Sequence, residues 1–74
     1  MPGGSVLLQI TPSEHVVLQS LAEGRSRGQV AALLELRDRE LDAMLLGLFA
    51  RMRVASEPEA VAAAVRRGLV DIGR

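Results

Sequence analysis

The side chains with the clearest chemical potential are the arginines in the middle of the chain. Between residues 25 and 53, six arginines stand against four carboxylates, an excess of two positive charges. The arginines are Arg25, Arg27, Arg37, Arg39, Arg51 and Arg53. The carboxylates are Glu35, Asp38, Glu40 and Asp42. Guanidinium groups bind phosphate through several N–H donors at once. Arg25, Arg27 and Arg39 are therefore candidate phosphate clamps, unless these arginines are simply solvated helix ends and turns.

Most other chemistry is excluded by what the sequence lacks. The chain has no cysteine, which excludes disulfides, thiolate metal sites and cysteine nucleophiles. His15 is the only histidine, and nothing near it has metal-ligand spacing. The carboxylates have no nucleophile or base partner, and Gly3-Gly4 precedes no strand-to-helix turn of a phosphate loop. We therefore expect that the protein is not an enzyme and that it binds neither a cofactor nor a metal ion.

Length and charge narrow the class of protein. The 74 residues predict one domain, and the formal net charge is zero, whereas DNA-binding domains usually carry a positive excess. Phe49 is the only aromatic residue, which excludes a base-stacking surface. No apolar run approaches the roughly 18 residues of a membrane span, and residues 1–10 lack a secretory signal pattern. We expect a cytoplasmic protein with no membrane partner.

Helix-start signals recur along the chain. Thr11-Pro12-Ser13-Glu14, Ser26-Arg27-Gly28-Gln29 and Ser56-Glu57-Pro58-Glu59 match the capping box, in which a hydroxyl and a carboxylate or amide satisfy two backbone amides reciprocally. A longer helix is predicted from about Asp38 to Met52. Its N-cap position holds Arg37, which cannot accept an amide hydrogen bond, so we expect Asp38 to take over as the cap.

Apolar residues repeat at helical spacing after each start. They are Val17, Leu18, Leu21 and Ala22, then Val30, Ala31 and Leu34, then Leu41, Leu45, Leu48 and Met52, and finally Ala60, Val61, Ala64 and Val65. Gly24 and Gly68 should end the first and the fourth helix. No segment shows strand alternation. The sequence therefore predicts an all-α domain of four helices over residues 10–74, preceded by a flexible or extended N-terminal arm over residues 1–9.

A short helix, a tight turn at Glu35-Leu36 and a longer helix are typical of a helix-turn-helix. The surrounding pattern comprises Ile10-Thr11-Pro12, Glu14, Val17-Leu18, Leu21-Ala22, Gly24, Ser26, Val30-Ala31-Ala32, Leu34, Leu36, Leu41, Leu48, Met52, Val54, Ala60-Val61, Ala64 and Gly68-Leu69. With these residues the sequence from Ile10 to Val70 resembles, without gaps, the output domain alone of the LuxR family of bacterial regulators. The resemblance implies a four-helix domain that binds double-stranded DNA as a homodimer. It also implies that the third helix enters the major groove and the fourth makes the dimer contact.

The third helix departs from the family pattern. Arg37 stands where the family has a capping serine, Glu40 where it has a phosphate-binding threonine, and Asp42 where it has lysine. Met44 replaces a frequent histidine. Carboxylates near a duplex oppose binding by about 1 kcal/mol each in water.

The groove-facing side of this helix is mostly small and apolar. Helical geometry opposes the core stripe with Arg39, Asp42, Ala43, Leu46, Gly47 and Ala50. Of the side chains that usually read base edges, this face offers only Arg39. Small residues around Leu46, and the apolar Leu33 on the second helix, suit a protein contact. The alternative is that a slight rotation of the helix turns Leu46 inward.

The fourth helix offers a dimer surface. Val61, Ala64 and Val65 can serve the core, while Ala62, Ala63 and Arg66 are expected to lie outside. The candidate dimer or partner contacts are Ala62, Val65, Arg66, Leu46, Gly47 and Ala50. The homodimer contact itself is expected through the fourth helix.

Two functions remain open. The first is a small stand-alone LuxR-type transcription regulator whose DNA binding is weak or atypical. Its candidate DNA-binding residues are Arg25, Arg27, Arg37, Arg39, Asp42, Ala43 and Leu46. The alternative is a protein-interaction module derived from this fold, which uses the third helix to bind a partner regulator or a transcription component and does not bind DNA.

Overall fold

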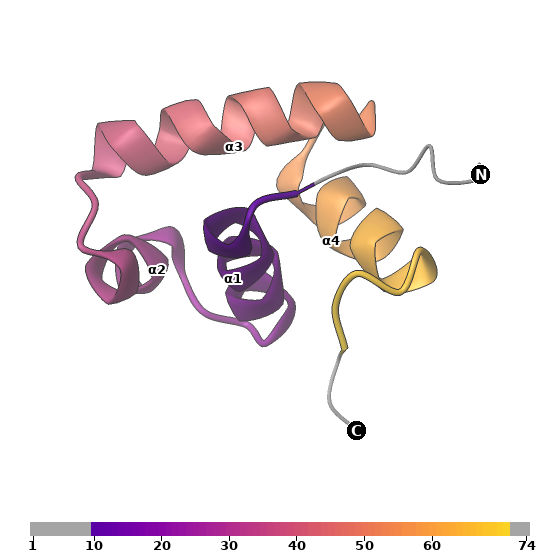
Figure 1. Cartoon of the computed structure of the whole chain (residues 1–74), viewed down its shortest axis with the longest axis horizontal. Helices are drawn as coiled ribbons and strands as arrows, with labels where there is room; N and C mark the ends of the chain where they lie inside the picture. The colour runs from indigo at the N-terminus through magenta and orange to yellow at the C-terminus, as the bar shows by residue number, and fades with distance from the viewer. Residues whose placement is uncertain (1–9, 72–74) are drawn as a thin grey trace.

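Four helices make up the computed structural model, which describes residues 10–71 (Figure 1). They are α1 (Pro12–Ala22), α2 (Arg27–Leu34), α3 (Asp38–Met52) and α4 (Glu57–Arg66). Within the described residues there is no strand, so the all-α prediction is confirmed. The expected N-terminal arm over residues 1–9 lies outside the described part of the chain. No helix in that part is long and apolar enough to cross a membrane.

The first two helices begin at the predicted capping boxes. The Glu14 amide donates to Thr11 Oγ1 at 3.1 Å, and the Thr11 amide donates to Glu14 Oε1 at 3.0 Å. At α2 the Gln29 amide donates to Ser26 Oγ at 3.2 Å, and the Ser26 amide donates to Gln29 Oε1 at 2.9 Å. Each box satisfies two amides that the helix itself leaves without a partner.

The capping hydrogen bonds of α3 and α4 differ from the prediction. Arg37 is the N-cap residue of α3 and its side chain makes no cap, so the expectation that Asp38 caps this helix is wrong. Glu40 makes only the reciprocal half of a capping box, in which its carboxylate accepts from the Arg37 amide at 2.8 Å, and Asp38 is already helical. At α4 the Ser56 hydroxyl accepts from the Glu59 amide at 3.3 Å, but the Glu59 carboxylate accepts from the Ala55 amide at 2.7 Å. The third motif is therefore only half of a capping box.

All four helices end in the same hydrogen-bonded turn. In α2 the Glu35 amide donates to the Ala32 carbonyl at 3.2 Å, and the Leu36 amide donates to the Ala31 carbonyl at 2.8 Å. This pair of bonds is the Schellman motif, which requires a left-handed residue after the helix. Glycine occupies that position in two helices, as predicted, at Gly24 and Gly68. In α2 and α3 the left-handed residue is Glu35 (φ 58°) or Arg53 (φ 61°), both unfavourable for a side chain.

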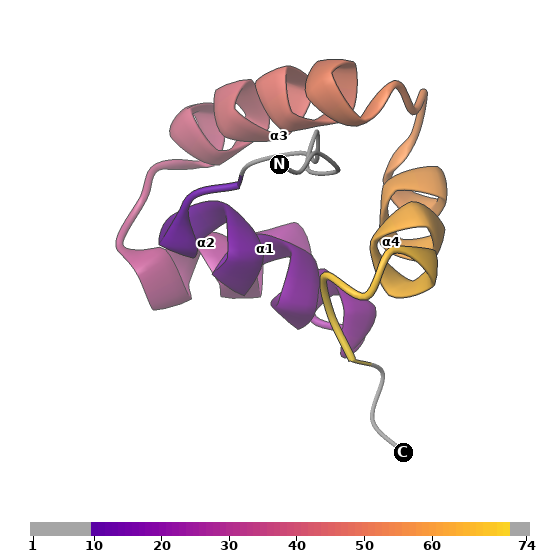
Figure 2. The same ribbon diagram turned by 45° about the vertical axis from the view of Figure 1, so that its right-hand side comes forward.

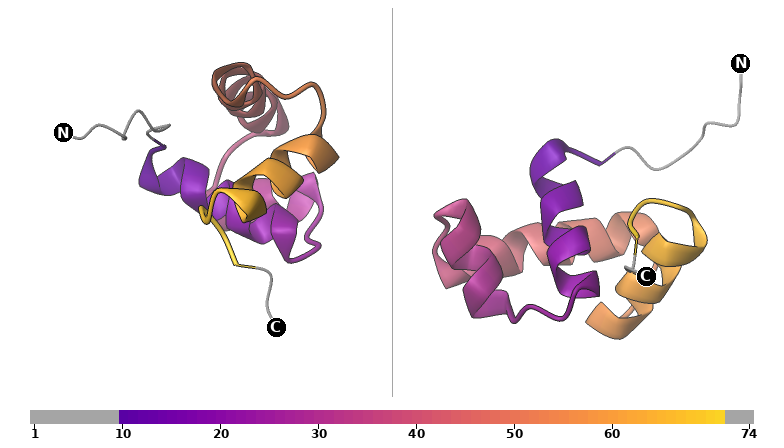
Figure 3. Two further views of the ribbon diagram at one scale, coloured as in Figure 1. Left: turned by 90° about the vertical axis from the view of Figure 1, so that its right-hand side faces the viewer. Right: turned by 90° about the horizontal axis from the view of Figure 1, so that it is seen from below.

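Helix α3 spans one side of the domain, and α1 lies between α2 and α4 beneath it (Figures 2 and 3). Contacts join α1 to both of its neighbours and α3 to α2 and α4. The core that they enclose contains mainly aliphatic side chains. Its largest fully buried side chains are Leu18, Leu41, Leu45, Leu48, Met52, Val17 and Val30.

Helix α4 is rotated relative to the prediction. Ala63 is 1% exposed and belongs to the core, so its expected place on the outside is wrong. The buried stripe of α4 consists of Ala60, Ala63 and Ala64, which moves Val61 and Val65 to half-buried positions at its edge. These three alanines let the α4 backbone approach the rest of the core closely.

The chain after α4 is tied back to α1. The side-chain amide of Gln19 donates to the Asp71 carbonyl at 2.7 Å, and its oxygen accepts from the Asp71 amide at 3.2 Å. Val70 is buried just before this point. A single side chain of α1 thus pairs with both backbone polar groups of Asp71.

Candidate nucleic-acid interface

The outer face of α3 is open along its length. All six residues that sequence geometry placed there are exposed, namely Arg39, Asp42, Ala43, Leu46, Gly47 and Ala50. Leu46 is 71% exposed, which excludes the alternative that it turns into the core. A ligand of any kind therefore has access to an apolar centre on this helix.

Arg27 is the first residue of α2 and contacts two other helices. Its Nη1 lies 2.7 Å from Asp42 Oδ1 on α3, and its Nε lies 2.9 Å from Glu57 Oε1 on α4. The hydrogen bond to Glu57, opposed by partial burial and reinforced by Asp42, raises the pKa of Arg27 above its ordinary value. Two of the predicted DNA-binding residues, Arg27 and Asp42, therefore bind each other.

Glu57 belongs to this network but was not among the functional residues predicted from the sequence. It lies 30 positions beyond Arg27 in the chain, and sequence reasoning used it only as part of a helix start. Local spacing carries no signal for such a pair, because the contact depends on how the helices assemble and bring the starts of α2 and α4 together.

Arg25 has a weaker engagement. Its Nε lies 3.5 Å from Glu23 Oε1, and both side chains are about half exposed. Exposed pairs of this kind stabilise a protein by no more than about 1 kcal/mol and exchange readily with other anions. Arg25 is therefore accessible to a phosphate group.

Arg37 and Arg39 flank the start of α3. Both are exposed, and neither has an ion pair with another residue between 10 and 71. Glu40 lies between them in sequence and accepts from the Arg37 backbone. Among the candidate cations, Arg27 is thus neutralised by two carboxylates and Arg25 is paired with one, while Arg37 and Arg39 have no ion pair within residues 10–71.

Arg51 has a structural role. Near the C-terminal end of α3 it pairs with the Glu14 carboxylate, which is buried at the start of α1. Burial opposes ionisation of Glu14, but the Thr11 backbone amide and the Arg51 guanidinium outweigh it, so the pKa of Glu14 lies below its ordinary value. This pair joins the first helix to the third.

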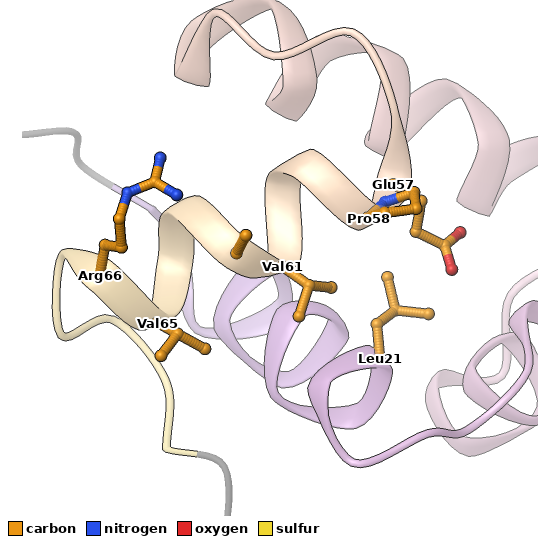
Figure 4. A pocket seen from close by; sticks show the side chains of 7 residues that line it. Leu21, Glu57, Pro58, Val61, Val65 and Arg66 are labelled. Carbon is orange, nitrogen blue, oxygen red and sulfur yellow. The ribbon is translucent and has the colours of Figure 1, made fainter.

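A groove runs between α1 and α4 on another side of the domain (Figure 4). Leu21, Pro58, Val61, Ala62 and Val65 give it apolar walls, and Glu57 and Arg66 complete its lining. The predicted α4 contacts Ala62, Val65 and Arg66 come together here. The predicted α3 contacts Leu46, Gly47 and Ala50 do not line this groove and belong to a separate surface.

Among residues 10–71 no three side chains of histidine, aspartate or glutamate converge on a common point where a metal ion could sit. Comparison of the chain with protein-family models, curated proteins and solved structures found no significant match.

Proposed function

We propose that this chain is a LuxR-type helix-turn-helix domain that acts in cytoplasmic transcription regulation by engaging double-stranded DNA through α2 and α3. The observation that carries the proposal is the geometry of these two helices. A three-residue turn, Glu35 to Arg37, joins the short α2 to the long α3, and the outer face of α3 is exposed throughout. Such an arrangement suits insertion of the second helix into a major groove.

The charges support contacts to phosphate more than readout of bases. Arg25, Arg37 and Arg39 are exposed around the helix-turn-helix, and each offers donors for phosphate oxygens. Arg39 is the only exposed side chain on the outer face of α3 that commonly pairs with guanine. We therefore propose weak binding with little sequence preference, in agreement with the zero net charge of the chain.

A homodimer through α4 accompanies this role. The groove between α1 and α4 presents Ala62 and Val65 on an apolar wall with Arg66 beside them. In a symmetric dimer the same patch serves both subunits, so an exposed groove of small apolar residues is a suitable contact.

Fluorescence anisotropy with a labelled random-sequence duplex tests the DNA-binding role. The protein should bind at micromolar concentration in low salt and lose affinity steeply as salt rises. Arg39→Ala should weaken binding severalfold, while Arg67→Ala removes an equal charge after α4 and should change it little. Equal effects of the two substitutions would mean that the overall charge of the protein attracts DNA and that the proposed interface has no special part in binding.

A protein-interaction role is the second candidate, favoured by two exposed leucines. Leu46 on α3 is 71% exposed and Leu33 on α2 is 56% exposed. Glu40 and Asp42 lie on the same helix as Leu46 and oppose phosphate. In this case α3 binds a partner regulator or a transcription component. Asp42→Lys distinguishes the two roles, because it should strengthen DNA binding if DNA is the ligand and disrupt the protein complex otherwise.

A further inference from the structure

Arg27 is held by carboxylates from two other helices at the edge of the proposed DNA-binding surface. Its side chain is 45% exposed, yet Asp42 takes its Nη1 at 2.7 Å and Glu57 takes its Nε at 2.9 Å. From this geometry we infer that the Arg27–Asp42 ion pair is an autoinhibitory contact, in which Asp42 occupies the guanidinium group that a DNA phosphate would otherwise bind. The inference rests on the proposed DNA-binding role and adds a control of affinity to it.

The position of Arg27 suits a phosphate contact. It stands at the first turn of α2, where the helix dipole favours an anion. A hollow of about 290 Å³ opens beside it between α2 and the start of α3, lined by Arg27, Gly28, Asp38, Leu41 and Asp42. An anion that approaches this hollow meets the guanidinium group and Asp42 together.

The two carboxylates have different roles. Glu57 binds Nε and fixes the direction of the guanidinium plane from the side of α4. Asp42 binds Nη1, one of the two terminal nitrogens that pair with phosphate in a bidentate contact. Loss of Asp42 alone therefore leaves Arg27 oriented by Glu57 and its terminal donors available.

Phosphate can compete with Asp42 for Arg27, because the Arg27–Asp42 pair is exposed to solvent. An ion pair with both side chains about half exposed is weak enough to open. One further phosphate contact steepens the dependence of log K on log salt by about 0.9, which at 50 mM salt is a gain of roughly tenfold in affinity. The contact therefore sets DNA affinity within this range and leaves the fold unchanged.

Asp42→Ala and Asp38→Ala form a matched pair for the test. Both substitutions remove one negative charge from the first five residues of α3, and both residues line the same hollow. Of these two aspartates, only Asp42 pairs with Arg27. Anisotropy salt titrations on a random duplex should show for Asp42→Ala a gain of roughly tenfold at 50 mM salt and a slope steeper by about 0.9. Asp38→Ala should gain about twofold with the slope unchanged. Asp42→Asn keeps the shape and loses the charge, and should fall between them.

The same measurements in an Arg27→Gln background separate release of Arg27 from simple loss of negative charge. There, Asp42→Ala should behave like Asp38→Ala, with no change of slope. An equal gain from Asp42→Ala with and without Arg27, or equal gains from Asp42→Ala and Asp38→Ala, would overturn the inference while DNA binding stands. Absence of salt-sensitive binding in the unsubstituted protein and in every variant would overturn the proposed function itself, and the inference with it.

Discussion

Arg27 and Asp42, 15 positions apart in the sequence, meet at 2.7 Å between Nη1 and Oδ1 across the junction of α2 and α3. The acidic residue on the α3 surface therefore does more than repel phosphate. It also pairs with Arg27, so this neighbouring cation is less available to a ligand on the same surface. Arg37 and Arg39 are left as the exposed cations at the start of α3.

Glu14 should make the stability of the domain sensitive to acid. Its pKa is lowered in the folded state, chiefly by the Thr11 amide and Arg51 acting against burial. A lowered folded pKa adds stability that is present above the ordinary glutamate pKa of about 4.3 and is lost as the pH falls through the folded value. Glu14→Gln should cost about 1–2 kcal/mol at neutral pH, measured by urea unfolding.

The pH dependence distinguishes this pair from ordinary surface charge. The difference in unfolding free energy between the protein and Glu14→Gln should shrink as the pH falls below about 5, because the carboxylate becomes protonated. Glu23→Gln is the control, since Glu23 pairs with Arg25 only at the surface. A pH-independent difference for Glu14→Gln would show that its charge contributes nothing.

Glycine should stabilise the domain at two helix ends where the left-handed residue now carries a side chain. Glu35 and Arg53 adopt φ values of 58° and 61°, where a side chain is strained. Glu35→Gly and Arg53→Gly should each stabilise the domain by about 0.5–1 kcal/mol in thermal or urea unfolding. Arg67→Gly is the matched control, because Arg67 follows α4 with a right-handed φ of −89° and should lose stability instead. Destabilisation by all three would refute the left-handed turns.

Adjacent leucines on α3 should respond oppositely to truncation. Leu45 is 1% exposed and Leu46 is 71% exposed. Leu45→Ala should cost about 2–5 kcal/mol of unfolding free energy, because it leaves a cavity in the core. Leu46→Ala should change it by no more than about 0.5 kcal/mol. A large cost at Leu46 would mean that the outer face of α3 is occupied within the fold and is not available to a ligand.

A charged side chain in the proposed α4 contact should prevent dimerisation. Ala62 is exposed in the α1–α4 groove, so Ala62→Glu should leave the fold intact and place a desolvated charge in the dimer contact. Sedimentation equilibrium should show a monomer for Ala62→Glu and a dimer for Ala32→Glu, the same change at an exposed position of α2. A protein that is monomeric without substitution would contradict the proposed contact.

Local sequence signals were sufficient to predict the four helices. Thr11 with Glu14 and Ser26 with Gln29 satisfy amides within three residues of each other, so their geometry depends on nothing distant. Gly24 and Gly68 mark their turns for the same reason. The open face of α3 also followed from spacing alone, since its buried stripe from Leu41 to Met52 fixes which residues are opposite.

Features that depend on packing were not predictable in this way. The rotation of α4 that buries Ala63 is set by contact with its neighbours, and alanines occur on both sides of that helix. The cap of α3 was misassigned, because Arg37 holds the N-cap position without a side-chain cap and Glu40 reaches back to its amide. The contact of Arg27 with Asp42 and Glu57 joins three helices and is visible only once they are assembled.

An NMR titration of the ¹⁵N-labelled protein with a short duplex at low salt tests whether α2 and α3 engage DNA. We expect amide shifts at residues 25–28, at Arg37 and in the first half of α3, and reversal of these shifts on addition of salt. The residues that line the α1–α4 groove should not respond to the duplex. An absence of shifts at low salt, or shifts confined to that groove, would show that α2 and α3 do not bind DNA and would leave α3 as a surface for a protein partner.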